Sequence, residues 1–449
     1  MFNDSSTKIR MTNDVKMGRM FFLAFVAALG GLLFGYDTAV ISGTIDQVTA
    51  QFGLDDIQQG WYVGCALMGS ICGVAVSGVM SDRLGRKPTM FVSAFLFTLS
   101  AAGCAVCTGF DSLVAYRIVG GVGIGIVSVV APIYISEISA AQHRGQLVSM
   151  YQLAITVGFL VAYLANYLLQ NVSQTMAFSH SGMQLILVDE VWRGMLGMET
   201  LPALLFFGIL FLIPESPRWT VVRKEKKTEW KSLLHPGILR AVVIGVCIAM
   251  LGQFMGVNAV LYYGPSIFRD ANVGNPLFCQ VLVGVVNTLT TILAMFIIDR
   301  VGRKKLIYYG VSGMVVCLLC IAYYFIWGET AGLSAYFMLV FFLLYVFCTA
   351  ISISAIVFVL LSEMYPNSIR GLAMSIAGFS LWIGTYLIGQ LTPWLLSALT
   401  PGGTFLLFAL MCVPYMLIIW RMVPETAGMS LEDIERFWTT KVQKQHLCE

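Results

Sequence analysis

One acidic residue, Asp37, stands in the middle of the first apolar stretch of the chain, within the segment GGLLFGYDTAVISG. A carboxyl group is costly in such surroundings, so we expect it to face the interior of the helix bundle and to mark a functional site. Arg117, in the fourth apolar stretch, is the expected partner, because it is the only basic residue predicted near the same depth. Burial favours the neutral acid and the arginine favours the carboxylate, so the pair can take up and release a proton. A fixed structural ion pair is the alternative.

Isolated amides in other apolar stretches suit a neutral ligand rich in hydroxyl groups, because amides both donate and accept hydrogen bonds. Gln253, Asn258 and Tyr262 follow at spacings that place them near one face of a helix. The rest of this predicted binding set consists of the amides Gln152 and Asn287 and the aromatic residues Phe34 and Trp382, on which a sugar ring can stack. Hydrogen bonding between helices is the alternative for each amide taken alone.

A set of charged motifs occurs twice along the chain. The first copy contains Asp82, Arg83, Arg86, Glu137, Arg144 and Glu215, and the second contains Asp299, Arg300, Arg303, Glu363, Arg370 and Glu425. Glycine permits a tight turn in each Asp-Arg-x-Gly-Arg-Lys sequence, and the arginines can pair with glutamates at neighbouring helix ends. Such pairs can lock one conformation and break in another, which predicts a gating network. Charges that only mark a membrane boundary are the alternative.

Composition predicts the elements that carry these residues. The chain has 449 residues, of which 58% are hydrophobic and only 11% charged, and its mean hydropathy is +0.81. Soluble domains carry about twice that charge, which argues against a soluble enzyme, a disordered chain or a nucleic-acid binder. We expect an all-α membrane protein with spans of about 20 residues each. Twelve apolar runs occur at about 20–43, 58–80, 88–108, 112–136, 147–170, 194–213, 240–265, 278–298, 306–327, 334–361, 372–398 and 403–423.

No cofactor, metal site or enzyme chemistry is expected. The four histidines lie in predicted loops or chain ends without the spacing of a metal site or a catalytic triad. Most of the cysteines lie inside apolar runs, where they are expected to pack as small hydrophobic side chains.

Basic residues orient the chain in the bilayer. With both termini in the cytoplasm, only Arg117, Arg193 and Arg269 of the 27 Lys and Arg residues lie outside predicted cytoplasmic segments. The repeated motifs indicate two six-helix halves, an architecture of alternating-access transporters. The predicted parts are a cytoplasmic tail at 1–19, bundles at 20–213 and 240–423, a cytoplasmic connector at 214–239 and a cytoplasmic tail at 424–449. The protein is expected in the plasma membrane, which is the inner membrane if the host is a bacterium.

These motifs together resemble the sugar porter family of the major facilitator superfamily, over nearly the whole chain. The resemblance rests on residues 30–43, both Asp-Arg-x-Gly-Arg-Lys turns, Pro214 to Trp219, Pro424-Glu425-Thr426 and the pattern from Gln253 to Tyr263. It implies twelve helices in two pseudo-symmetric bundles and inward transport of a pentose or hexose, similar to xylose or glucose, together with a proton. It also implies that Asp37 is the proton site, that Arg117 is its partner, and that the sugar is contacted by Gln152, Gln253, Asn258, Asn287 and Trp382.

Several positions depart from the family pattern. The seventh-helix glutamine pair of relatives is replaced by Gly252-Gln253, a second fifth-helix glutamine by Phe159, and the polar residue before Trp382 by Leu381. The tenth-helix Gly-Pro-x-x-Trp segment of relatives is replaced by residues 354–358, so Phe358 stands where relatives stack a tryptophan on the sugar. Each change removes a hydrogen bond, a stacking face or the mobile Gly-Pro. We therefore expect a ligand that differs from xylose or binds more weakly.

A proton-independent facilitator of a sugar, or of another polyol such as an inositol, is the nearest alternative function. A sugar sensor that does not transport is a more distant one, because only a short tail follows the last apolar run. The expected partners are a sugar, a proton and the lipid bilayer, without nucleic acid, and the monomer is expected to suffice for function.

Overall fold

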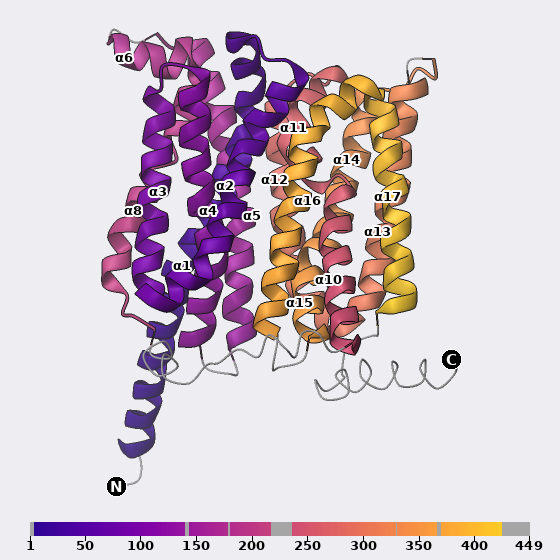
Figure 1. The fold of residues 1–449 in the computed structure, drawn as a ribbon. Coiled ribbons are helices and arrows are strands. Elements are labelled where there is room, and N and C mark those ends of the chain that lie inside the picture. The colour runs from indigo at the N-terminus through magenta and orange to yellow at the C-terminus, as the bar shows by residue number, and fades with distance from the viewer. Residues whose placement is uncertain are drawn as a thin grey trace. The chain divides into compact units, whose positions relative to one another are not determined.

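Helices make up nearly all of the described chain in this computed structural model, which covers residues 4–139, 143–177, 180–216, 236–328, 330–365 and 370–423 (Figure 1). No β-strand occurs within those ranges. The described residues contain 12 helical spans that are long and apolar enough to cross a membrane, and each overlaps one of the predicted apolar runs. The predicted all-α membrane fold is confirmed.

The first half of the chain contains ten helices and single turns. They are α1 (Asp4–Phe52), α2 (Asp56–Leu84), α3 (Arg86–Val106), α4 (Phe110–Ile138), α5 (Arg144–Thr175), α6 (Ser181–Gln184), the π-helical turn η1 (Leu185–Asp189), α7 (Val191–Gly197), α8 (Thr200–Ile209) and the short 3₁₀ turn η2 (Leu210–Leu212). The sixth span begins with α7 and continues through α8 and η2.

Two of the last six spans are interrupted. The helices are α10 (Pro236–Phe254), α11 (Val257–Asp270), α12 (Pro276–Val301), α13 (Arg303–Trp327), α14 (Ala335–Thr349), the π-helical turn η4 (Ala350–Ser354), α15 (Ala355–Met364), α16 (Arg370–Ala398) and α17 (Thr400–Met422). The seventh span breaks between α10 and α11, and the tenth contains η4.

Glycine makes the two charged turns possible, as the sequence indicates. Gly85 separates α2 from α3 with a φ of 107°, and Gly302 separates α12 from α13 with a φ of 93°. Residues with a side chain rarely adopt such a backbone conformation. The same residue type therefore makes the same reversal in both halves of the chain.

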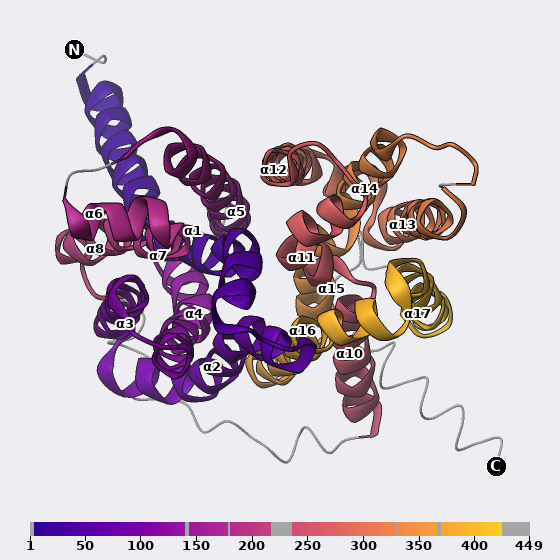
Figure 2. The same ribbon diagram turned by 90° about the horizontal axis from the view of Figure 1, so that it is seen from above.

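Two compact units divide the chain. The first unit contains the described residues of Met1–Val40, Gly69–Ala165 and Val172–Lys226. The second unit contains the described residues of Ile41–Met68, Asn166–Asn171 and Lys227–Glu449. In the first unit α3 packs along α4, and in the second α10 packs on α16 while α13 packs on α14 and α17. Figure 2 shows most of these helices end-on, so that the packing within each unit can be followed. Most of the connector lies outside the described residues, so the predicted bundle boundaries stay a prediction.

Candidate functional site

An ion pair between Asp37 of α1 and Arg117 of α4 is buried inside the first unit. The two side chains are 1% and 3% exposed. Nη1 of Arg117 donates to Oδ1 of Asp37 and also lies 3.4 Å from the Asp37 main-chain oxygen. The second carboxylate oxygen, Oδ2, is buried and has no hydrogen-bond partner among the described residues. The structure thus brings together the two residues predicted for proton coupling and leaves one oxygen able to hold a proton.

A second buried acid, Glu199, lies close to this pair and is missing from the predicted site. It directly precedes α8, is 3% exposed, and its Oε1 atom has no hydrogen-bond partner in the part of the chain that the structure describes. Its charge interacts with those of Asp37 and Arg117. Glu199 lies inside the predicted sixth apolar run, so the argument that identifies Asp37 also applies to it.

Two of the predicted sugar-binding amides meet where the seventh span breaks. Gly256 has a left-handed φ of 87°, and its missing side chain leaves room for the ring of Phe408. The break places Gln253 at the end of α10 and Asn258 at the start of α11, and Asn258 Nδ2 donates to Gln253 Oε1 over 2.6 Å. Irregular backbone of this kind inside a membrane span is typical of transporter binding sites.

Thr385 of α16 is a third member of this cluster that sequence reasoning missed. Its hydroxyl lies 3.2 Å from Gln253 Oε1 and donates to it. A buried threonine on an apolar helix carries no distinguishing signal in the sequence, because most bond only to their own helix. Its contact with Gln253 depends on how α16 packs against α10.

The other predicted sugar contacts are distributed over both units. In the second unit, Tyr262 of α11, Asn287 of α12 and Trp382 of α16 are all buried. In the first, Phe34 of α1 and Gln152 of α5 are half-buried. The side chain of Phe358 lies outside the described part of the chain. Binding of a sugar by these residues stays a prediction.

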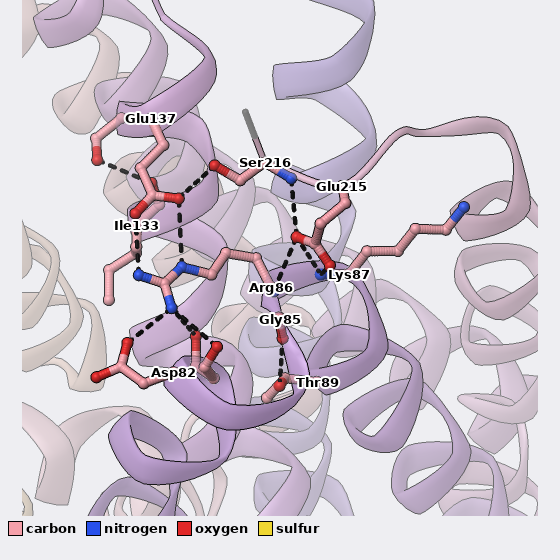
Figure 3. Close-up of polar contacts among 11 residues, drawn as sticks. Asp82, Gly85, Arg86, Lys87, Thr89, Ile133, Glu137, Glu215 and Ser216 are labelled. Carbon is pink, nitrogen blue, oxygen red and sulfur yellow. Dashed lines mark hydrogen bonds and ion pairs between the residues drawn. The ribbon is translucent and has the colours of Figure 1, made fainter. Parts of the chain in front are cut away.

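The first charged network joins the α2–α3 turn to two more segments of the first unit (Figure 3). Arg86, 8% exposed, donates to both carboxylate oxygens of Glu137 at 3.2 and 3.0 Å and to Asp82 Oδ1 at 2.8 Å. Glu137 at the end of α4 also accepts from the hydroxyl of Ser216 over 2.5 Å. The guanidinium therefore ties the turn to α4, and α4 is tied to the segment that follows η2.

Glu215 contributes to this network in a way that differs from the expectation. It was predicted to pair with an arginine side chain, but in the described residues its carboxylate accepts from the backbone N–H groups of Arg86, at 2.9 Å, and Lys87, at 3.2 Å. These are the first amides of α3, which have no partner within their own helix. A carboxylate at a helix N-terminus is favoured by the helix dipole, which accounts for the arrangement.

The second copy of the motif also forms a charged contact in the described residues. Arg303 at the start of α13 donates to Glu363 Oε1 over 3.0 Å, and the amine of Lys304 donates to the main-chain oxygens of Trp420 and Val423. Arg83 and Arg300 are exposed. Glu425 lies outside the described residues, as do the side chains of Arg144, Asp299 and Arg370. The role of these residues in gating stays a prediction.

Comparisons with known proteins agree with this architecture. The family model described as sugar (and other) transporter matches residues 23–229 and 222–438. The chain is 34% identical to the arabinose-proton symporter of Bacillus subtilis, over 96% of this chain and 97% of that protein. It is 33% identical to the D-xylose-proton symporter of Escherichia coli K12, over 97% of this chain and 99% of that protein.

The fold is also similar to that of solved structures. The inward-open conformation of the xylose transporter XylE from E. coli matches with a TM-score of 0.79 at 34% identity, covering 93% of this chain and 100% of that one. The relatives and the family are transporters and not enzymes. The chain therefore belongs to the sugar transporter family, and it is a multi-pass membrane protein with the fold of a sugar porter of the major facilitator superfamily.

Proposed function

We propose that this chain imports a monosaccharide, a pentose or a hexose, together with a proton by alternating access. The observation that carries the proposal is the Asp37–Arg117 pair, buried in the first unit with one carboxylate oxygen unpartnered. Relatives over almost the full length carry the names arabinose-proton and D-xylose-proton symporter, which supports the same reaction class.

Proton transfer at Asp37 changes what Arg117 can do. An ionised Asp37 holds the guanidinium by charge and hydrogen bond, and a protonated Asp37 holds it far less strongly. A guanidinium released at this depth needs another counter-charge, since an unpaired buried charge is costly. In this proposal Glu199, a buried acid whose charge acts on Arg117, loses its proton and supplies that counter-charge. The proton can thus bias the helices α1, α4 and α8 between two arrangements.

The sugar is held, in this proposal, by the amides and aromatic residues predicted from the sequence. Gln253 and Asn258 at the break in the seventh span supply hydrogen bonds, and Trp382 supplies a stacking face. Gln152, Asn287, Phe34, Tyr262 and Phe358 complete the proposed set. The paired networks around Arg86 and Arg303 act as gates on the cytoplasmic side. The protein works in the plasma membrane as a monomer with both termini in the cytoplasm.

Uptake into proteoliposomes tests the proposal. We expect labelled xylose, arabinose or glucose to accumulate when an inward pH gradient is applied. Asp37→Asn cannot exchange a proton, so accumulation should fall to the equilibrium level while exchange of sugar without a gradient continues. Asp111→Asn, which neutralises an exposed acid on α4, is the matched control and should behave like the wild type.

Two results would contradict the proposal at different levels. Accumulation against a gradient that persists in Asp37→Asn would remove the coupling role of this residue and leave the transport function standing. A wild-type protein that moves sugar only to equilibrium would identify a facilitator. If none of the sugars enters or competes, the sugar assignment itself is wrong.

A further inference from the structure

The hydrogen bonds around Gln253 fix which face of its amide is open to a ligand. Its Oε1 atom accepts from Asn258 Nδ2 at 2.6 Å and from the hydroxyl of Thr385 at 3.2 Å. An amide oxygen has two lone pairs, so these two bonds use its accepting capacity. The Nε2 group, with two N–H donors, is what Gln253 retains for a ligand.

Thr385 is held firmly enough to orient its neighbour. Its hydroxyl is shared between Gln253 and the main-chain oxygen of Leu381 on its own helix, which lies 2.9 Å away. The residue is 4% exposed, whereas Gln253 and Asn258 are only half-buried. The preceding residue, Gly384, has no side chain, and a Cβ atom there would lie 3.1 Å from Gln253 Cγ. Helix α16 thus approaches α10 closely at the level of Gly384.

We propose that Thr385 is a positioning residue, which locks the Gln253 amide so that it donates to an oxygen of the transported sugar. Asn258, whose Nδ2 is engaged with Gln253, correspondingly presents its Oδ1 as an acceptor for a sugar hydroxyl. The inference rests on the proposed function, since it assigns a direction to hydrogen bonds in the proposed sugar site. It predicts a ligand with a hydrogen-bond acceptor and a hydroxyl donor at neighbouring positions.

A valine in place of Thr385 keeps the shape of the side chain and removes the hydroxyl. In Thr385→Val the Gln253 amide loses one of its two anchors, and we expect KM for xylose, arabinose or glucose to rise about three- to tenfold, the typical effect of one neutral hydrogen bond. The maximal rate should stay within about twofold, since the helix movements are unaffected. Thr385→Ser should restore the wild-type KM.

The chain offers a matched control on the same helix. Thr392 of α16 is 1% exposed and bonds to the main-chain oxygen of Ile388 at 2.6 Å, as Thr385 does to Leu381. Thr392→Val therefore reports the cost of losing a buried threonine hydroxyl that does not contact Gln253. We expect its KM to match the wild type, and thermal unfolding of both valine variants in detergent to show similar small losses of stability.

Sugar analogues test the direction of the bond. A deoxyfluoro sugar retains a weak acceptor but no donor, and a deoxy sugar retains neither. At the hydroxyl that Gln253 contacts, the fluoro analogue should compete with the sugar better than the deoxy analogue does in the wild type. In Thr385→Val, the difference between the inhibition constants of the two analogues should be smaller. At the hydroxyl that Asn258 contacts, both analogues should compete equally poorly.

The outcomes separate this inference from the proposed function. If wild-type protein takes up sugar and Thr385→Val has the same KM as Thr392→Val, Thr385 does not position the amide. The same conclusion follows if Thr385→Ser fails to restore KM, or if no hydroxyl position favours the fluoro analogue. If the wild type takes up none of the three sugars, the proposed function fails, and the inference fails with it.

Discussion

At the scale of single residues, three of the buried charged residues of the first unit, Asp37, Arg117 and Glu199, belong to one group. Arg117 bonds to Asp37, and the charge of Arg117 also acts on Glu199, so we expect Glu199 to balance the guanidinium when it is ionised. We expect Glu199→Gln to slow proton-driven uptake by about tenfold or more, because protonation of Asp37 would then leave a buried charge unpaired, at a cost of several kcal/mol. Sugar exchange without a pH gradient should be retained. Initial rates in proteoliposomes, with and without the gradient, measure both.

Glu190→Gln provides the control for that prediction. Glu190 pairs with Arg193, three residues along the chain, and its side chain is 24% exposed. Its loss should change proton-driven uptake little. Wild-type accumulation in Glu199→Gln would mean that Asp37 and Arg117 suffice for coupling.

Functional residues could be predicted from the sequence only where their type is rare in its surroundings. Asp37 and Arg117 are conspicuous because charge is scarce inside apolar runs, and the structure places them in contact. Glu199 satisfies the same criterion and was missed, since it lies near the start of its run, where an acid is easily assigned to a loop. Thr385 could not have been found, because its bond to Gln253 depends on the packing of α16 against α10.

At the scale of elements, the break in the seventh span is the feature that positions the amides. Gly256 holds a left-handed backbone conformation, and a Cβ there would strike the ring of Phe408. We expect Gly256→Ala to lower the free energy of unfolding by about 1–3 kcal/mol, the cost of strain at such a site. Because Gln253 and Asn258 lie on either side of the break, KM for the sugar should also rise. Thermal unfolding and uptake kinetics measure the two effects.

Gly378 of α16 supplies the comparison for this prediction. It has ordinary helical backbone and no atom within 4 Å of an added Cβ. Gly378→Ala should therefore be neutral or slightly stabilising, since alanine reduces the freedom of the unfolded chain. Equal effects of the two substitutions would show that the break does not depend on glycine.

The interruptions within the seventh and tenth spans could not be predicted from the sequence. Gly35 and Gly43 of the first run have the same spacing as Gly256 and Gly264 of the seventh, yet α1 is continuous and the seventh span is broken between α10 and α11. The tenth run lacks the Gly-Pro of relatives, and the π-helical turn η4 occupies residues 350–354. A π-turn arises from one extra residue in a turn and has no sequence signature, although such turns are frequent at functional sites.

At the scale of the whole molecule, the fold could be predicted because its determinants are summed over many residues. The length of each span is set by the thickness of the bilayer, and all 12 spans were visible as apolar runs. The paired motifs likewise indicated where charged contacts would form, and Arg86 and Arg303 do contact glutamates. The capture of backbone amides by Glu215 depends on the path of the chain after η2, which composition does not determine.

The first charged network provides a test of whether these repeated contacts govern the transport cycle. In Glu137→Gln the Arg86 guanidinium loses its buried carboxylate partner. Among the described residues, the charged partner that remains is Asp82, whose side chain is 77% exposed. We expect a loss of about 2–4 kcal/mol in stability, because a buried charge loses its buried partner. The maximal uptake rate should fall several-fold, while KM stays within about twofold, since the binding amides belong to other helices.

Asp82→Asn removes only the exposed partner of Arg86, and it should lower the free energy of unfolding by at most about 1 kcal/mol. A change in KM with an unaltered maximal rate in Glu137→Gln, or a larger effect from Asp82→Asn, would show that this network does not gate transport.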